Sequence, residues 1–337
     1  MILRYKTYFL EFIHPFRIAI NTRTQTPIIL LELESNGIIG YGEASLPPYL
    51  FETQESVIHF FKKVDGDYLD TLSSMDLMLD YIFQLEPGNM AAKAALDIAL
   101  HDLWAKKSHQ TLYSFLGINP SNMRPSSFTL GMDDLKLLPL KLEEAESFKI
   151  LKVKLGGYND LEIIKSIRNH SDKPLYIDAN QGWTDKELAL ERIHWLADQG
   201  VILIEQPMPK KRELDQAWLL KRSPIPILAD EDCQTYEDIS QLLGRYTGIN
   251  IKLMKCGGLR EAFKMIKLAR ELNLEIMMGC MNESSCAIMA GAVPACLVDY
   301  IDLDGPFLIN NNPFQNPRIK EGIIQFNDSP GLGLEPI

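Results

Sequence analysis

The stretch that decides the fold is "LKVKLGG", residues 151–157, because it belongs to a pattern that the following chain repeats. It reads as a short buried strand that contains Lys152 and Lys154. Side chains two apart in a strand point to the same face, so we expect the two ammonium groups to lie side by side. Burying such a pair is costly unless negative charge lies nearby or one amine gives up its proton.

Short apolar runs recur from residue 128 onward, and helix-like amphipathic segments separate most of them. The runs are "FTLG", "ILKVKLG", "LYIDAN", "VILIEQP", "IPILADE", "INIKLM", "EIMMG" and "YIDLDG". From the second run onward, one residue near the end of each run marks its position: Lys154, Asp178, Glu205, Asp230, Lys252, Gly279 and Asp302. Successive residues in this series are 24, 27, 25, 22, 27 and 23 positions apart in the sequence. A strand, a helix and two loops need about this length, so eight units predict an α/β fold, a (β/α)8-type or modified TIM barrel. An open doubly wound sheet is the alternative, although no GxGxxG follows the early strands.

The first part of the chain has a different pattern. "TPIILLELE" and "IIGYGEAS" flank the turn-forming triplet "SNG", which predicts an antiparallel hairpin. The later stretch "NMAAKAALDIALHDLWAKK" is rich in helix formers, and "GINPSNMRPSSF" has the composition of a domain boundary. We therefore expect an α+β domain over residues 1–120 and a barrel domain over residues 121–309.

Composition indicates a soluble globular protein and argues against two classes of partner. The 337 residues carry a net charge of −11, which disfavours binding to nucleic acid or to anionic membranes. Charged residues interrupt the first twenty positions, so we expect neither a signal peptide nor a membrane span. The five cysteines are odd in number and form no CxxC, as expected of free thiols in the cytoplasm.

Three acidic residues close three consecutive strands: Asp178 in "LYID", Glu205 in "VILIE" and Asp230 in "IPILAD". The carboxyl ends of barrel strands form the active face, so these carboxylates should converge. Like charges so close together favour a bound cation, and oxygen ligands without His or Cys indicate Mg²⁺ rather than zinc. The alternative is that each carboxylate caps the helix after its strand, which is harder to sustain for three in succession.

Lysines lie on the strands before and after the three acids. Lys152 and Lys154 precede the first, and Lys252 follows the last, so they should lie on opposite sides of the metal. This arrangement suits a reaction that removes a proton from one face of a carbon and returns one to the other. The alternative for each is a structural counter-ion, a role that we expect in part for Lys152. No histidine lies at a strand end, and no GxSxG or P-loop occurs, so we expect neither a histidine base nor covalent catalysis.

The last strand carries a second acidic pair in "DLDG". Asp302 and Asp304 are two apart and should share a face at the barrel mouth, beyond the metal ligands. Such a pair indicates a cationic group on the ligand. The alternative is a pair of solvated loop acids.

Together these motifs resemble the enolase superfamily, in its muconate-lactonizing subgroup, and most closely the dipeptide epimerases. The resemblance covers nearly the whole chain: "GYGEAS", "KVKLG", "DANQGW", "EQP", "ADE", "NIKLMKCGG", "GCMNESS" and "DLDGP". It implies a capping domain made from the N-terminal segment and completed by the tail, residues 310–337.

The resemblance also implies a role for each site residue. Asp178, Glu205 and Asp230 would bind one Mg²⁺ ion per active site. Lys154 and Lys252 would be the acid/base pair, while Lys152 would lie next to the substrate carboxylate and help to lower the pKa of Lys154. Asn180 and Glu231 would lie behind the metal ligands. Asp302 and Asp304 would bind the substrate ammonium, and Arg23 and Met281 would contact the rest of the substrate.

The activity so implied is Mg²⁺-dependent epimerisation of a small-molecule dipeptide. It is a 1,1-proton transfer at the α-carbon of the C-terminal residue through an enediolate. The acidic pair favours a dipeptide over muconate or succinylbenzoate substrates, which lack an ammonium group. An o-succinylbenzoate synthase or a cycloisomerase on the same scaffold is the alternative, and a binding protein without catalysis is a third.

Substrate preference should come from the cap. "AINTRTQT", residues 19–26, falls where relatives have a mobile loop over the substrate. Arg23 would there pair with an acidic side chain, as in L-Ala-D/L-Glu, a murein-derived dipeptide. The sequence leaves the oligomeric state open, a homo-oligomer included.

Overall fold

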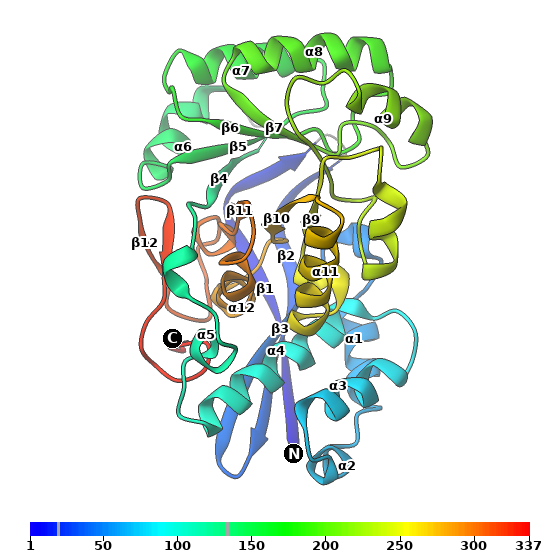
Figure 1. Cartoon of the computed structure of the whole chain (residues 1–337). Helices are drawn as coiled ribbons and strands as arrows, with labels where there is room; N and C mark the ends of the chain where they lie inside the picture. Colours follow the sequence, from blue (N-terminus) through cyan, green and yellow to red (C-terminus); the bar gives the residue numbers. More distant parts are fainter. Residues whose placement is uncertain (19–20, 132–134) are drawn as a thin grey trace.

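A computed structural model describes residues 1–18, 21–131 and 135–337. The molecule is elongated, with the N-terminal helices at one end, the helices of the first barrel units at the other, and the long strands of the antiparallel sheet running between them (Figure 1). The antiparallel sheet has the order β1 (Ile2–Ile18), β2 (Asn21–Ser35) and β3 (Ile38–Ser45). Asn36 and Gly37, both at positive φ, connect β2 to β3, which confirms the predicted hairpin at "SNG".

Strand β1 is the longest in the protein's described part, and the sequence pattern did not predict it. It is the edge strand, paired with β2 alone in its sheet. Leu10 and Phe12 are buried on one face, whereas Phe9 and Ile13 on the other are 45% and 44% exposed. Apolar residues therefore occur on both faces, and this hides the period of two by which a half-buried strand is recognised.

In the described chain, five α-helices follow this sheet: α1 (Gln54–Phe61), α2 (Gly66–Thr71), α3 (Met75–Gln84), α4 (Met90–Lys107) and α5 (Leu112–Phe115). Helix α4 packs closely across β3, because Gly40 and Gly42 leave room for its backbone. The α4 residue Asp97 also accepts hydrogen bonds from the backbone N–H of Leu259, at 2.6 Å, and of Arg260, at 3.2 Å. Since those residues begin a helix of the barrel, α4 ties the cap to the barrel.

The parallel sheet contains the eight predicted strands in sequence order: β4 (Ser127–Leu130), β5 (Ile150–Lys154), β6 (Leu175–Asp178), β7 (Val201–Glu205), β8 (Ile227–Ala229), β9 (Gly248–Ile251), β10 (Glu275–Gly279) and β11 (Tyr300–Asp302). A bridge from Ser126 to Ile301 brings the last strand back to the first and closes the barrel. The chain therefore has the predicted (β/α)8-type barrel with an α+β cap.

The connections between the strands are mostly helical, as the pattern predicted. The helices are α6 (Leu138–Glu144), α7 (Asp160–Arg168), α8 (Lys186–Asp198), α9 (Glu213–Leu220), α10 (Leu253–Cys256), α11 (Leu259–Glu271) and α12 (Ser285–Ala295). Between β8 and β9 a 3₁₀ helix, Tyr236–Leu242, takes the place of an α-helix.

The C-terminal tail returns to the cap. It includes the short hairpin β12 (Arg318–Lys320) and β13 (Ile323–Gln325), drawn in red beside α5 in Figure 1. The backbone N–H of Leu332 donates to Asp102 of α4 at 2.7 Å, and Phe12 forms a bridge with Ile309. All five cysteines are free. Across the described ranges, no helix combines the length and the apolar character that crossing a membrane requires.

Candidate active site

The three predicted metal ligands meet at the carboxyl ends of neighbouring strands. Asp178 ends β6, Glu205 ends β7 and lies next to it in register, and Asp230 directly follows β8. Each offers an oxygen within 4.8 Å of the others, and all three side chains are buried. Barrel closure thus produces the acidic cluster that the strand spacing predicted.

Each of these carboxylates lies at hydrogen-bond distance from a lysine ammonium group. Lys154 Nζ lies 2.5 Å from Asp178 Oδ2, and Lys252 Nζ lies 2.6 Å from Asp230 Oδ2. Between them, Lys152 Nζ lies 2.6 Å from Glu205 Oε2. Two lysines can therefore share a buried strand face, because a carboxylate at hydrogen-bond distance compensates each positive charge.

Burial and neighbouring charges separate the protonation behaviour of these groups. Burial by itself would lower the pKa of Lys152, but the Asp302, Glu205 and Asp178 carboxylates outweigh it and hold that pKa well above its usual range. Burial and then the Asp178 charge raise the pKa of Glu205 to about 7. Burial opposes ionisation of Asp230 too, yet its neighbouring lysines hold its pKa well below the usual range. Lys152 consequently stays an ammonium at neutral pH.

The residues around the cluster fit a bound Mg²⁺ ion. The three carboxylates supply hard oxygen ligands, and two more buried oxygens, Asn180 Oδ1 and Glu231 Oε2, have no hydrogen-bond partner in the described part of the chain. Burial and the charges of Asp230 and Asp178 raise the pKa of Glu231 to about 8. An oxygen-lined, electron-rich site of this kind fits one Mg²⁺ as its cofactor.

A pocket opens over this cluster. Its wall includes every predicted site residue except the fully buried Asp178 and Glu205. Six of the described lining residues were not predicted: Phe16, Thr129, Gln181, Cys280, Asn282 and Leu308. The strand-end rule would have found Thr129, which lies in "FTLG", and Asn282 follows the predicted Met281 directly. Phe16 and Leu308 carry no sequence signal, since Phe16 comes from the cap and Leu308 from the loop after the last barrel strand.

The second acidic pair is buried, with Asp302 4% and Asp304 3% exposed, so these are not solvated loop acids. Asp302 accepts hydrogen bonds from Ser127 Oγ and Lys152 Nζ, each at 2.7 Å. Burial would raise its pKa, but Lys152 lowers that pKa below the usual value. Asp304 accepts from the backbone N–H of Thr129 at 2.6 Å, and burial together with the Asp302 charge raises its pKa to about 7. The two acids thus have different surroundings.

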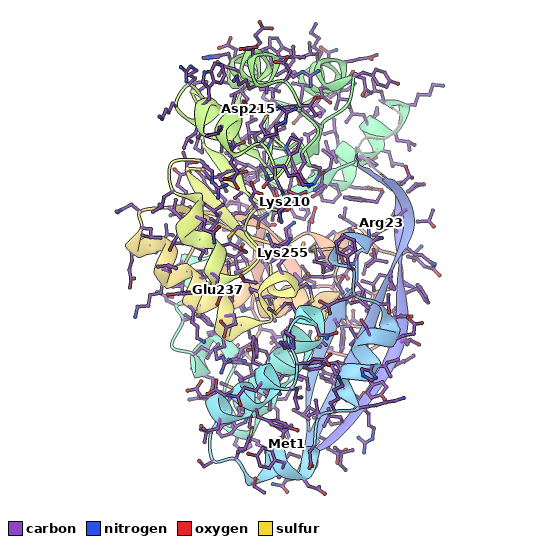
Figure 2. The ribbon with its side chains drawn as sticks, turned by 90° about the vertical axis from the view of Figure 1, so that its right-hand side faces the viewer. Met1, Arg23, Lys210, Asp215, Glu237 and Lys255 are labelled. Carbon is purple, nitrogen blue, oxygen red and sulfur yellow. The ribbon has the colours of Figure 1, made fainter. Side chains whose placement is uncertain are left out.

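The cap contributes Arg23 to the pocket wall. Arg23 belongs to β2 and lies about halfway along the molecule in Figure 2, where the cap meets the barrel. Its Nη2 donates to Asn282 Oδ1 at 2.9 Å, and its Nη1 donates to Thr26 Oγ1 at 3.2 Å. The predicted loop over residues 19–26 differs from the structure, because the chain from Asn21 onward belongs to β2 and pairs with β1. Residues 19–20 of that segment lie outside the described residues.

Comparison with known proteins agrees with this geometry. Residues 140–337 match the model of the enolase C-terminal domain-like family, and residues 7–117 match that of the mandelate racemase / muconate lactonizing enzyme N-terminal domain. The chain belongs to the mandelate racemase and muconate lactonizing enzyme family. It is an enzyme of the racemase and epimerase class.

Individual relatives of this family member cover almost its full length. An L-Ala-D/L-Glu epimerase of Bacteroides thetaiotaomicron is 47% identical over 98% of this chain and 86% of its own. The dipeptide epimerase of Enterococcus faecalis, solved with Mg and L-Leu-L-Tyr, has a TM-score of 0.89 and 29% identity over 99% of this chain and 98% of its own. An N-succinyl Arg/Lys racemase of Bacillus cereus has a TM-score of 0.90 and 26% identity over 99% and 95%.

Proposed function

We propose that this enzyme epimerises dipeptides at the α-carbon of the C-terminal residue, with one Mg²⁺ bound by Asp178, Glu205 and Asp230. One observation carries the proposal. The pocket is lined by two lysines from different strands, Lys154 and Lys252, and each is anchored on a different carboxylate of the cluster. A pair of amines placed in this way suits proton removal on one face of a carbon and proton return on the other.

In the proposed reaction, one lysine takes the α-proton as a neutral amine, and the other donates a proton from its ammonium. When bound, Mg²⁺ would supply positive charge to the substrate carboxylate and so acidify the neighbouring C–H bond. Proton loss leaves an enediolate with additional negative charge on oxygen. The Lys152 ammonium lines the pocket and stabilises that charge more than it stabilises the starting carboxylate. Protonation on the opposite face completes the inversion.

Asp304 is the member of the acidic pair that we assign to the substrate ammonium. Asp302 already accepts hydrogen bonds on both oxygens, one of them from Lys152, so we assign it to holding that lysine in place. An incoming ammonium beside Asp304 would favour its ionised form. Muconate and succinylbenzoate precursors carry no cation, and N-succinyl amino acids have an acylated α-amino group that carries no charge. The buried pair therefore supports a dipeptide, which has a free α-ammonium, over all of them.

Arg23 supports a preference for an acidic side chain. Its hydrogen bonds to Asn282 and Thr26 hold the guanidinium group at the pocket wall, where it would pair with the carboxylate of a C-terminal glutamate. We therefore propose L-Ala-D/L-Glu as the preferred substrate, in line with the name of the Bacteroides relative. Met281, which is buried at the pocket wall, would contact the substrate through its apolar side chain.

The domain limits and the biological setting belong to the same proposal. Residues 1–120 with the tail 310–337 would form the cap, and residues 121–309 would form the catalytic barrel. A cytoplasmic location, a role in murein peptide metabolism and a homo-oligomeric state remain predictions.

A dipeptide library in D₂O tests the proposed function. Metal-free enzyme is supplied with Mg²⁺ and each L-Xaa-L-Xaa dipeptide, and mass spectrometry with chiral chromatography follows exchange and configuration. We expect one deuteron to enter the C-terminal residue, with inversion, and fastest for glutamate at that position. An N-succinyl amino acid and a succinylbenzoate precursor serve as competing substrates. Turnover of either, with no exchange into any dipeptide, would overturn the proposal.

A further inference from the structure

Lys255 is a buried lysine that belongs neither to the acid/base pair nor to the metal ligands of the proposed function. It lies on α10, three residues after Lys252, and is only 3% exposed. Its Nζ donates to Asp230 Oδ1 at 2.6 Å, to the Asp230 backbone oxygen at 2.8 Å and to the Asn250 backbone oxygen at 2.9 Å. An ammonium group has three N–H donors, so all of them are used.

Asp230 is held by two lysines that differ in their access to the pocket. Lys252 takes Oδ2 and lines the pocket, whereas Lys255 takes Oδ1 and is not among the described lining residues. The contact to Oδ1 is combined with a contact to the backbone oxygen of the same residue. Together the two fix both the position of Asp230 and the rotation of its carboxylate.

The same lysine is connected to a second metal ligand. The backbone oxygen of Asn250 accepts from Lys255, while the side-chain Nδ2 of Asn250 donates to Glu205 Oε1 at 2.7 Å. Asn250 is fully buried, and Gly279 on the neighbouring strand leaves space for it, since a Cβ there would lie 2.4 Å from Asn250 Oδ1. Lys255 therefore reaches one metal ligand directly and another through one residue.

We propose that Lys255 is a positioning residue that preorganises Asp230 and Glu205 for Mg²⁺. Three buried carboxylates repel one another, and the cluster must hold its geometry before a metal arrives. The ammonium group of Lys255 supplies a positive charge outside the pocket, and all three of its N–H groups donate hydrogen bonds to the protein. Metal ligands are commonly oriented by such hydrogen-bonded neighbours, whose loss lowers metal affinity about 10–100-fold. This inference rests on the metal role that the proposed function gives to Asp178, Glu205 and Asp230.

Lys255→Met is the variant that tests this inference, because methionine keeps the length and apolar stem of the side chain but removes the charge and its donors. Isothermal titration of the metal-free protein with Mg²⁺ should show a Kd at least about tenfold weaker than in the wild type. The apparent Mg²⁺ requirement of turnover should rise in parallel, while saturating Mg²⁺ restores part of kcat.

Lys93→Met is the matched control. Lys93 is equally buried, at 2% exposed, and donates to the backbone oxygen of Glu86 at 2.8 Å, but it lies on α4 in the cap. Its loss should lower the melting temperature and leave the Kd for Mg²⁺ unchanged. A purely structural role of Lys255 would give the same result as this control.

A folded Lys255→Met protein with the wild-type Kd for Mg²⁺ would overturn the inference. If that variant does not fold, Lys255→Gln, which keeps two N–H donors without the charge, is titrated and judged by the same criterion. The titration needs no dipeptide, so it separates the two proposals. Wild-type protein that binds Mg²⁺ but exchanges no dipeptide hydrogen refutes only the function, whereas wild-type protein that binds no Mg²⁺ refutes both.

Discussion

A buried pair of glutamates at the junction of cap and barrel should make the stability of the metal-free protein depend on pH. Glu43 of β3 is fully buried and accepts hydrogen bonds from the backbone N–H and the hydroxyl of Ser284. Glu283 is 2% exposed and accepts from the backbone N–H of Met281 at 2.9 Å. Burial and then the Glu43 charge raise the pKa of Glu283 from 4.5 to about 8, and burial raises that of Glu43 to about 7.

The direction of this pH dependence follows from the pH at which Glu283 loses its proton in the folded and in the unfolded protein. Below pH 4.5 Glu283 is protonated in both states, and well above pH 8 it is ionised in both. Between these values the unfolded chain releases the proton and the folded protein keeps it, so stability falls as pH rises. Each full pH unit costs about 1.4 kcal/mol, and integration from pH 6 to pH 8 with a folded pKa of about 8 gives about 2 kcal/mol.

Glu283→Gln should remove this loss, because glutamine can still accept from the N–H of Met281 but does not ionise. Thermal melting of the metal-free variant and wild type is compared at pH 6 and pH 8. The advantage of the variant in melting temperature should grow by a few degrees at the higher pH. Glu321→Gln, at an exposed glutamate, is the control and should leave the pH dependence of the wild type in place. An equal difference between Glu283→Gln and wild type at both pH values would refute the reasoning.

Three further predictions concern the pocket and the cap. Lys154→Ala and Lys252→Ala should each lower the rate of epimerisation about 10²–10⁴-fold, whereas each variant should still exchange the α-hydrogen of one stereoisomer. NMR in D₂O measures this exchange. Unchanged turnover in both variants would exclude the acid/base pair. Asp304→Asn should lower kcat/KM for dipeptides about 10–100-fold with the Kd for Mg²⁺ unchanged, and an unaltered kcat/KM would contradict ammonium binding. Gly42→Ala should destabilise by about 1–3 kcal/mol, because the new Cβ would lie 2.0 Å from the Ala95 backbone oxygen; a wild-type melting curve would disprove this close packing.

Much of the active site was predictable because a barrel converts sequence spacing into spatial proximity. Asp178, Glu205 and Lys252 lie at or directly after strand ends, as the spacing predicted. Their meeting requires no particular side-chain packing, since the carboxyl ends of parallel strands share one edge of the barrel. Lys152 was predicted from the same logic, being two residues before a strand end and on the same face.

Residues from distant segments were harder to predict. Phe16 and Arg23 reach the pocket because β1 and β2 extend from the cap to the barrel, and Leu308 reaches it from the loop after β11. Strand β1 itself was missed because an edge strand can expose apolar side chains on its outer face. No local pattern records how far a strand extends over another part of the molecule.

The sequence by itself determined the barrel, the acidic cluster and the lysines on either side of it, because all three follow from a period of 22–27 residues and the alternation of side chains within strands. Only the tertiary structure decided how the charges are paired. In the folded protein Lys152 pairs with Glu205 and Asp302, and Lys255 pairs with Asp230. Asp304 accepts a hydrogen bond from the backbone of Thr129 instead. Charge pairing depends on distances of a few ångströms between side chains from different strands, and the spacing of residues along the chain does not contain those distances.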